Sequence, residues 1–241
     1  MGLFDKKFCD ICGAKIGLLG NRKLDDGNMC KDCASLLSPY YADRRGSSVA
    51  LIKEHLAYRE ANRASVAALS ITRTLGRDGV KVMLDEDAKK FVVTSAQRWQ
   101  DANPDVLDFT QVTGCQTEIK ESRTELKQKD KDGKDVSYVP PRYDIDYDFY
   151  VTLQVNSPWF SQINFKVNSS RIKERVSAQY RETDQITKEI KAALTQVRED
   201  IRENAAAANA PKTAQVCGLC GATTMPDASG RCEYCGGPVN G

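Results

Sequence analysis

The strongest hydrophobic pattern in the chain is an alternation of apolar and polar residues between positions 143 and 155. Its apolar members occupy every second position: Tyr143, Ile145, Tyr147, Phe149, Val151, Leu153 and Val155. A period of two predicts a β-strand with one buried face. Asn156-Ser157-Pro158 then predicts a turn, and the alternation resumes at Ile163, Phe165 and Val167. The pattern favours an antiparallel sheet with one solvated face.

Shorter patterns extend this β domain over residues 80–168. Residues 80–93 alternate around an acidic turn and predict a hairpin. Residues 106–119 are predicted as a strand, and another strand is expected to run to about Lys129. The tight-turn signal Lys131-Asp132-Gly133-Lys134 separates that strand from the strong alternation described above.

A helix is predicted before the β domain. Ser47 or Ser48 is a suitable N-cap, and the helix is expected from Val49 to Leu75, with Gly76 as its stop. Its apolar residues form only a loose stripe.

A longer helix is predicted after the β domain, at residues 171–203, with Asn168-Ser169-Ser170 as its cap. At about 1.5 Å per residue it extends roughly 45 Å, which is longer than a small sheet can cover. Its second half would therefore need another partner, either the first helix or a second copy of the chain. Self-association through this helix is one hypothesis. Residues 204–213 are expected to form a linker.

Eight of the nine cysteines occur as two pairs of Cys-x-x-Cys motifs near the two ends of the chain. The first set is Cys9, Cys12, Cys30 and Cys33, and the second set is Cys217, Cys220, Cys232 and Cys235. This spacing is typical of tetrahedral zinc sites. Four thiolate ligands leave no open position for water, so two structural zinc ions are expected. Within the first module, residues 15–19 and 21–24 are predicted to pair as a small hairpin.

Composition narrows the range of functions. The 241 residues include 35 Lys and Arg and 33 Asp and Glu, so no strong overall field points to nucleic acid or an anionic membrane. Residues 1–79 contain 13 basic and nine acidic side chains, a weak excess of +4. No apolar run approaches eighteen residues, so no transmembrane helix is expected. Paired cysteines without an export signal favour reduced thiolates and a cytoplasmic location.

Four other features have a chemical and a structural interpretation. The single histidine, His55, is a candidate ligand or base, but a packed or exposed helix residue is favoured. The segment Asp130 to Asp135 resembles part of a calcium loop, and a hairpin turn is favoured. Asp144, Asp146 and Asp148 are candidates for binding a cation or a basic partner, and a solvated strand face is favoured. Cys115 is expected to pack as a small hydrophobic residue.

The segment from Cys9 to Pro39 resembles the N-terminal zinc-ribbon domain of an uncharacterised bacterial family. The resemblance lies in the sequences at Cys9–Gly13, Lys23–Gly27, Cys30–Cys33, Leu37–Pro39, Tyr58–Asn62 and Asn103–Val106. It implies that the first four cysteines are zinc ligands, and it implies no function. The β domain and its following helix are similar to pleckstrin-homology (PH)-like domains, and the C-terminal module is similar to a rubredoxin-type zinc ribbon.

The sequence therefore predicts an α+β protein: an antiparallel PH-like β domain with a long C-terminal helix, flanked by two four-cysteine zinc ribbons. The predicted parts are a ribbon at 1–40, a connecting helix at 47–76, the β domain with its helix at 80–203, a linker at 204–213 and a ribbon at 214–241.

A non-enzymatic zinc-binding adaptor is the favoured function, because one histidine and two closed metal sites offer no catalytic constellation. Its expected partner is a protein, and peripheral membrane contact is left open. The alternatives are a nucleic-acid-binding zinc-ribbon protein, associated with transcription or RNA, and a zinc-thiolate redox sensor.

Overall fold

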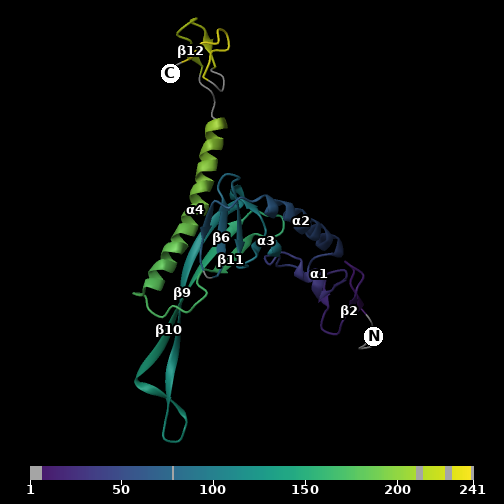
Figure 1. Ribbon diagram of the computed structural model, residues 1–241, viewed down its shortest axis with the longest axis vertical. Helices are drawn as coiled ribbons and strands as arrows, with labels where there is room; N and C mark the ends of the chain where they lie inside the picture. The colour runs from purple at the N-terminus through teal and green to yellow at the C-terminus, as the bar shows by residue number, and fades with distance from the viewer. Residues whose placement is uncertain (1–6, 78, 210–213, 226–229, 240–241) are drawn as a thin grey trace. The chain divides into compact units, whose positions relative to one another are not determined.

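The computed structural model describes residues 7–77, 79–209, 214–225 and 230–239, with the backbone alone from Gln196 to Asn209. The chain divides into two units, Met1–Arg198 and Glu199–Gly241. Figure 1 shows the order of the elements, which combine helices with several antiparallel sheets. The predicted mixture of helix and antiparallel sheet is confirmed. Among the described residues, no helix is long and apolar enough to cross a membrane.

Two antiparallel sheets form the body of the first unit. The four-stranded sheet has the order β5-β6-β7-β8, with strands at Arg73–Leu75, Lys81–Asp85, Lys90–Thr94 and Leu107–Asp108. The three-stranded sheet has the order β11-β10-β9, with strands at Gln162–Lys166, Asp135–Val155 and Val112–Lys129. The short helix α3 (Trp99–Ala102) precedes β8, and a 3-10 turn at Phe109–Gln111 leads into β9.

The alternation of strand β10 places its apolar face in the core. Phe149, Val151 and Leu153 are fully buried, whereas Tyr143, nearer the hairpin tip, is 52% exposed. Helix α4 (Ala178–Asn209) packs against this sheet, and Tyr180 contacts the ring of Phe149 edge-on at 5.0 Å. The same sequence pattern therefore runs from the core into a part of the hairpin that lies outside it.

Helix α2 (Val49–Ala68) is shorter than predicted. Ser48 caps its first turn, as expected, by accepting a hydrogen bond from the Leu51 amide. The helix ends at Ala68, because the following backbone joins the four-stranded sheet: Thr72 donates its amide to the Leu84 carbonyl. Residues 73–75 are strand β5, so the predicted helix end at Leu75 is wrong.

Helix α4 begins later than predicted. Asn168 does not cap it but lies beside β10, where its side-chain oxygen accepts from the Phe149 amide and its nitrogen donates to the Tyr147 carbonyl. Ile172 forms a β-bridge with Tyr147, which keeps this segment extended until the helix starts at Ala178. The helix continues to Asn209, so residues 204–209 of the predicted linker are helical, and residues 210–213 lie outside the described part.

Short strands frame the cysteine motifs at each end. In the N-terminal module, β1 (Lys7–Phe8) pairs with β2 (Lys15–Ile16), β3 (Arg22–Lys23) pairs with β4 (Asn28–Met29), and helix α1 (Lys31–Ser35) follows. The predicted pairing of residues 15–19 with residues 21–24 is therefore wrong, because each segment pairs with a strand beside a cysteine motif instead. In the second unit, β12 (Gln215–Val216) pairs with β13 (Thr223–Thr224).

Candidate metal centres and their support

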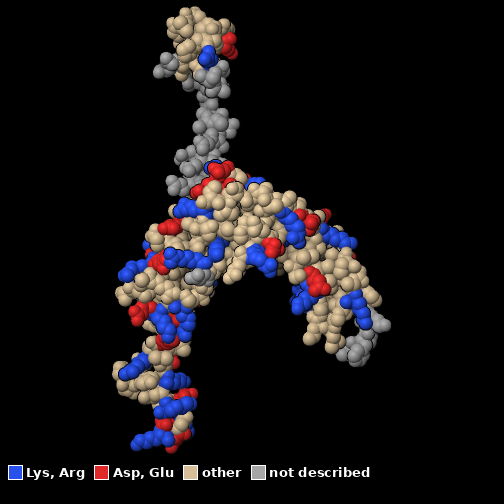
Figure 2. All heavy atoms as spheres, in the orientation of Figure 1, with Lys and Arg blue, Asp and Glu red and all other residues tan. Residues whose placement is uncertain are grey.

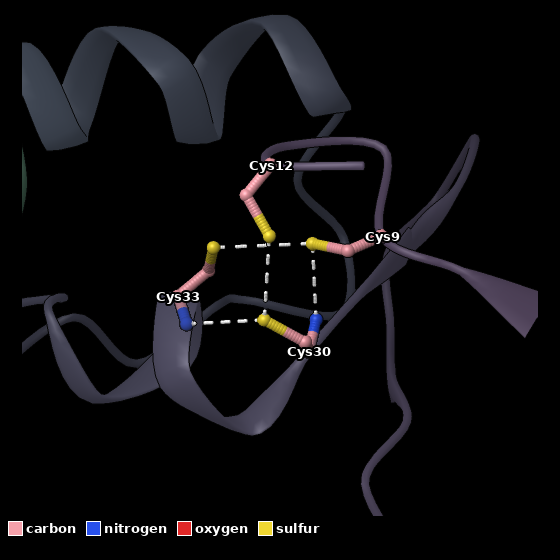
Figure 3. A group of neighbouring side chains, drawn as sticks. All are labelled: Cys9, Cys12, Cys30 and Cys33. Carbon is pink, nitrogen blue, oxygen red and sulfur yellow. Dashed lines mark hydrogen bonds between the residues drawn. The ribbon is translucent and has the colours of Figure 1, made fainter. Parts of the chain in front are cut away.

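The first four cysteines meet at one point, although 24 residues separate the outer two. The Sγ atoms of Cys9 and Cys33 lie 3.9 Å apart, and those of Cys12 and Cys30 lie 3.8 Å apart (Figure 3). A tetrahedral ion with metal–sulfur bonds of about 2.3 Å requires sulfur–sulfur distances of about 3.8 Å. A disulfide would need a sulfur–sulfur distance of only about 2 Å. The group can therefore hold a tetrahedral metal ion.

The second four cysteines repeat this geometry in the second unit. The Sγ atoms of Cys217 and Cys235 are 3.6 Å apart, and those of Cys220 and Cys232 are 3.8 Å apart. Within each group all four sulfur atoms lie within 4.8 Å of one another. The structure thus brings the eight predicted ligand residues together in the two sets that the spacing indicated.

A local turn shapes three of the four Cys-x-x-Cys motifs. In the first motif the Gly13 amide donates to the Cys9 carbonyl at 2.7 Å, and the Cys9 amide donates to the Ala14 carbonyl at 2.8 Å. Gly13 has φ of +74°, a left-handed conformation that favours glycine. The motifs followed by Gly221 and Gly236 have the same pair of hydrogen bonds, and both glycines also have a positive φ.

The motif Cys30–Cys33 is different because Ala34, not glycine, follows it. Here the chain enters helix α1 directly, and Cys30 is its N-cap: the Cys30 sulfur accepts from the Cys33 amide at 3.3 Å. The Cys30 amide in turn donates to the Cys9 sulfur at 3.2 Å (Figure 3). Such N–H···S bonds stabilise thiolates and orient them toward a common centre.

The thiols of the first group influence one another strongly. Burial opposes ionisation of Cys9, but the amides of Cys12, Cys30 and Ile11 outweigh it and lower its pKa to about 6. Burial and the neighbouring thiols raise the pKa of Cys33 well above its usual range. Four thiolates this close repel one another, and a bound cation removes that repulsion. The chemistry of the donor set therefore favours a soft divalent metal.

A buried polar network holds the first module against the β body. Asp105 lies at its centre, and its side chain is completely buried. The Arg59 guanidinium donates to the Asp105 carboxylate at 2.8 Å, and the Ser38 hydroxyl donates to it at 2.7 Å. Ser38 belongs to the exit from the N-terminal module, Arg59 belongs to α2, and Asp105 precedes β8, so one carboxylate connects three parts of the chain.

Two asparagines extend this network. The side-chain nitrogen of Asn62 donates to the Asn103 side-chain oxygen at 2.7 Å and to the Pro104 carbonyl at 2.8 Å. Asn103 donates back to the Arg59 carbonyl at 2.8 Å, and it adopts a left-handed backbone with φ of +50°. The sequence resemblance singled out Tyr58–Asn62 and Asn103–Val106 without giving them a role. The structure brings the two stretches into contact.

His55 is packed next to this network, as the structural interpretation predicted. Its ring is fully buried, stacks on Tyr41 at 4.4 Å and meets Trp159 at 4.9 Å. Neither ring nitrogen has a hydrogen-bond partner among the described residues. Burial lowers the pKa of His55 to about 4, partly offset by Asp105. The imidazole is therefore neutral near pH 7 and acts as part of an aromatic contact between α2 and the loop after β10.

The remaining candidate sites have structural roles. Asp144 accepts from Lys173, and Asp148 pairs with Lys166 at 2.6 Å, so these carboxylates are neutralised by their own chain. Asp130 accepts from the amides of Asp132 and Lys134 and closes the hairpin turn predicted there. Burial raises the pKa of Cys115 to about 11, which keeps this thiol protonated.

Comparisons with known proteins identify only the N-terminal module. A family model described as a domain of unknown function (DUF4428) matches residues 7–55, which contain the first cysteine group and the start of α2. No curated protein and no solved structure matches the chain. The resemblance of the N-terminal segment to a domain of unknown function is confirmed by this match.

Proposed function

We propose that this protein is a non-enzymatic zinc-binding adaptor with two structural zinc ribbons and a PH-like recognition domain. The observation that supports this proposal most strongly is the closed geometry of both cysteine groups. Four sulfurs at tetrahedral distances fill the coordination sphere of zinc, so the metal has no open position at which to activate water or substrate. Such sites stabilise small modules and leave their surfaces free for recognition.

The arrangement of the β body supports the PH-like part of the proposal. Four antiparallel strands in sequential order are followed by three more, and a long helix then packs on the second sheet. This is a fold-level analogy, and the fold alone does not define a ligand.

The only histidine also supports a non-catalytic role. Tyr41 and Trp159 enclose His55, and its depressed pKa makes it a weak base. Beyond the two tetracysteine groups, the described residues contain no cluster of His, Cys, Asp and Glu with metal-binding geometry.

Quantitative affinity capture tests the adaptor role. We expect the zinc-loaded full chain to capture a specific protein at a near-stoichiometric ratio. Cys12→Ser or Cys220→Ser should abolish that capture by removing one ribbon, whereas Cys115→Ala, which removes a thiol outside both groups, should leave it unchanged. Capture of no protein at such a ratio, or capture that neither ribbon variant reduces, would contradict the proposal.

A further inference from the structure

The β9–β10 hairpin extends beyond the sheet that supports its base. Strand β11 pairs with β10 only from Tyr150 to Gln154, and the bridge from Ile172 adds a neighbour at Tyr147. Farther toward the tip, the described residues form a two-stranded ribbon that reaches past the start of α4 (Figure 1). We call residues 119–146 the distal hairpin. An isolated two-stranded ribbon is marginally stable in water, and a third or fourth strand stabilises it.

Strand β9 presents the outer edge of this ribbon. It is the last strand of its sheet, with β10 on one side, and its residues from Gln116 to Lys129 are all exposed. A long strand edge offers a row of backbone donors and acceptors to another strand. The edge from Ile119 to Lys129 is therefore long enough for a specific strand–strand interface.

The charges along this edge alternate in sign. One face of β9 contains, at successive second positions, Glu121, Arg123, Glu125 and Lys127. Figure 2 shows basic and acidic side chains interspersed along the hairpin. A strand with mixed charges at regular intervals can be complementary to a second copy of itself, provided that the register is correct.

Symmetry restricts the available registers. Two identical antiparallel edge strands are related by a two-fold axis perpendicular to the sheet, so one residue on the axis faces its own copy. With Thr124 on the axis, Glu121 faces Lys127 and Arg123 faces Glu125. Each of these pairs occurs twice in the dimer, so four opposite-charge pairs form on one face.

The neighbouring registers are less favourable. An axis at Arg123 places Glu121 opposite Glu125, and an axis at Glu125 places Arg123 opposite Lys127. Like charges directly opposite each other destabilise a strand pair. The register centred on Thr124 avoids both repulsions, and it also places Ile119 against the aliphatic part of Lys129.

We propose that two copies of this chain associate through their β9 edges, antiparallel and centred on Thr124. The two distal hairpins then form a four-stranded ribbon in the order β10-β9-β9-β10. The partner that pairs with the β9 edge is a second copy of the chain, because the charges of this edge are complementary to those of its own copy. This interface is independent of the metal sites and of the proposed adaptor role.

Sedimentation velocity on the full-length, zinc-loaded chain tests this interface across about a thousandfold range of concentration. We expect a reversible monomer–dimer equilibrium. Thr124→Glu places two carboxylates opposite each other on the axis and should weaken the dimer severalfold. Ser122→Glu adds the same charge on the same face but opposite Leu126, and it should have a smaller effect.

Charge reversal provides a second test. In Glu125→Arg, the new arginine faces Arg123 of the other copy, and this repulsive pair occurs twice in the dimer. The variant should therefore weaken the dimer by about tenfold. The double variant Arg123→Glu/Glu125→Arg has the same composition as the natural chain and should restore the dimer. Circular dichroism checks that each variant remains folded.

Hydrogen exchange locates the contact. The outward-facing amides of residues 119–129 should exchange more slowly at high protein concentration than at low concentration. A chain that stays monomeric throughout the concentration range overturns the proposal. A dimer that neither Thr124→Glu nor Glu125→Arg weakens also overturns it, and would assign association to another surface such as helix α4.

Discussion

The two metal modules have the same ligand geometry but differ in what supports them. Around the first cysteine group, Leu24, Met29 and Ile52 are almost completely buried, and Ile52 belongs to helix α2. Around the second group, the described buried cluster contains only Cys217, Cys232 and Val239. The first module therefore shares a hydrophobic core with a helix, whereas the second is held together mainly by its ligands.

This difference shows how a small module can divide its stability between metal and core. A chain segment of this length has too little apolar surface to fold by itself. The first module adds core residues from α2 and an anchor at Asp105, so its position on the body is fixed by contacts that do not involve the metal. In the second module, Leu219 and Tyr234 are 73% and 69% exposed, and they contribute little burial.

The largest expected effect is loss of the second metal centre. Cys220→Ser removes one ligand from a module whose described residues form almost no other core, and metal binding contributes on the order of 10 kcal/mol to such folds. The bound zinc should fall from about two ions to about one ion per chain. Amide resonances of residues 214–225 and 230–239 should collapse to unfolded positions in a nitrogen–proton correlation spectrum, while those of the first unit remain.

The matched variant in the first module is Cys12→Ser. It should release the first zinc ion and disorder the two cysteine turns, but Leu24 and Met29 should stay packed against Ile52, and the two sheets stay folded because they have their own core. If Cys12→Ser also melted the sheets, or if Cys220→Ser left the second module folded, the contrast between the modules would be wrong.

The next largest effect concerns the buried anchor. Asp105→Asn leaves the Arg59 charge buried without its carboxylate, and breaking a buried pair in this way costs about 3–5 kcal/mol. For a unit of this size the melting temperature should fall by about 10 °C. Glu60→Gln is the control, because it breaks an ion pair on the same helix in which both partners are exposed. Its effect should not exceed about 1 °C, and a comparable loss from both variants would argue against the anchor.

A smaller effect should depend on pH. The folded protein keeps His55 neutral, with its pKa lowered to about 4, whereas the unfolded chain binds a proton near pH 6.5. The unfolded state therefore binds more protons below pH 6.5, and stability falls as the pH falls toward 4. Between pH 7 and pH 5.5 the first unit should lose about 1 kcal/mol from this residue.

Urea denaturation of the natural chain and of His55→Phe at the two pH values measures this contribution. Phenylalanine keeps an aromatic ring between Tyr41 and Trp159 and removes the titrating group. The pH-dependent loss should be smaller in the variant by the same amount. An equal loss in both proteins would show that His55 does not contribute.

The smallest effect compares one substitution in both modules. Gly13→Ala and Gly221→Ala each place a side chain at a φ near +74°, and open space surrounds both positions. Each should therefore cost only the left-handed backbone energy, about 1 kcal/mol. Competition with a zinc chelator should show nearly equal losses of affinity, and a clearly unequal loss would mean that the two turns are not equivalent.

The metal groups could be predicted from the sequence because their geometry is local. Each Cys-x-x-Cys motif and its turn is defined within about six residues, and a glycine follows three of the four motifs, at Gly13, Gly221 and Gly236. The strand pattern of β10 could be predicted for the same reason, since alternation is a property of adjacent residues.

The end of α2 and the start of α4 could not be predicted because distant partners determine them. The segment 69–75 leaves α2 to pair with Val82–Leu84, and Ile172 stays extended because it bridges to Tyr147. The contact between Arg59 and Asp105 could not be predicted either, since the two residues are 46 positions apart in the sequence. On a helix, Arg59 and Asn62 have the sequence character of solvent-facing residues, and only the loop at Asn103 gives them buried partners.

The anchor also has a consequence for the order of events during synthesis. Ser38 and its partner Asp105 are separated by 67 residues. At about 5–20 residues per second, the ribosome needs roughly 3–13 s to make the intervening chain. The four cysteines of the first group are therefore synthesised several seconds before Asp105. The nascent module can bind its metal during this time, and it can dock on the body only after the loop at Asp105 has emerged.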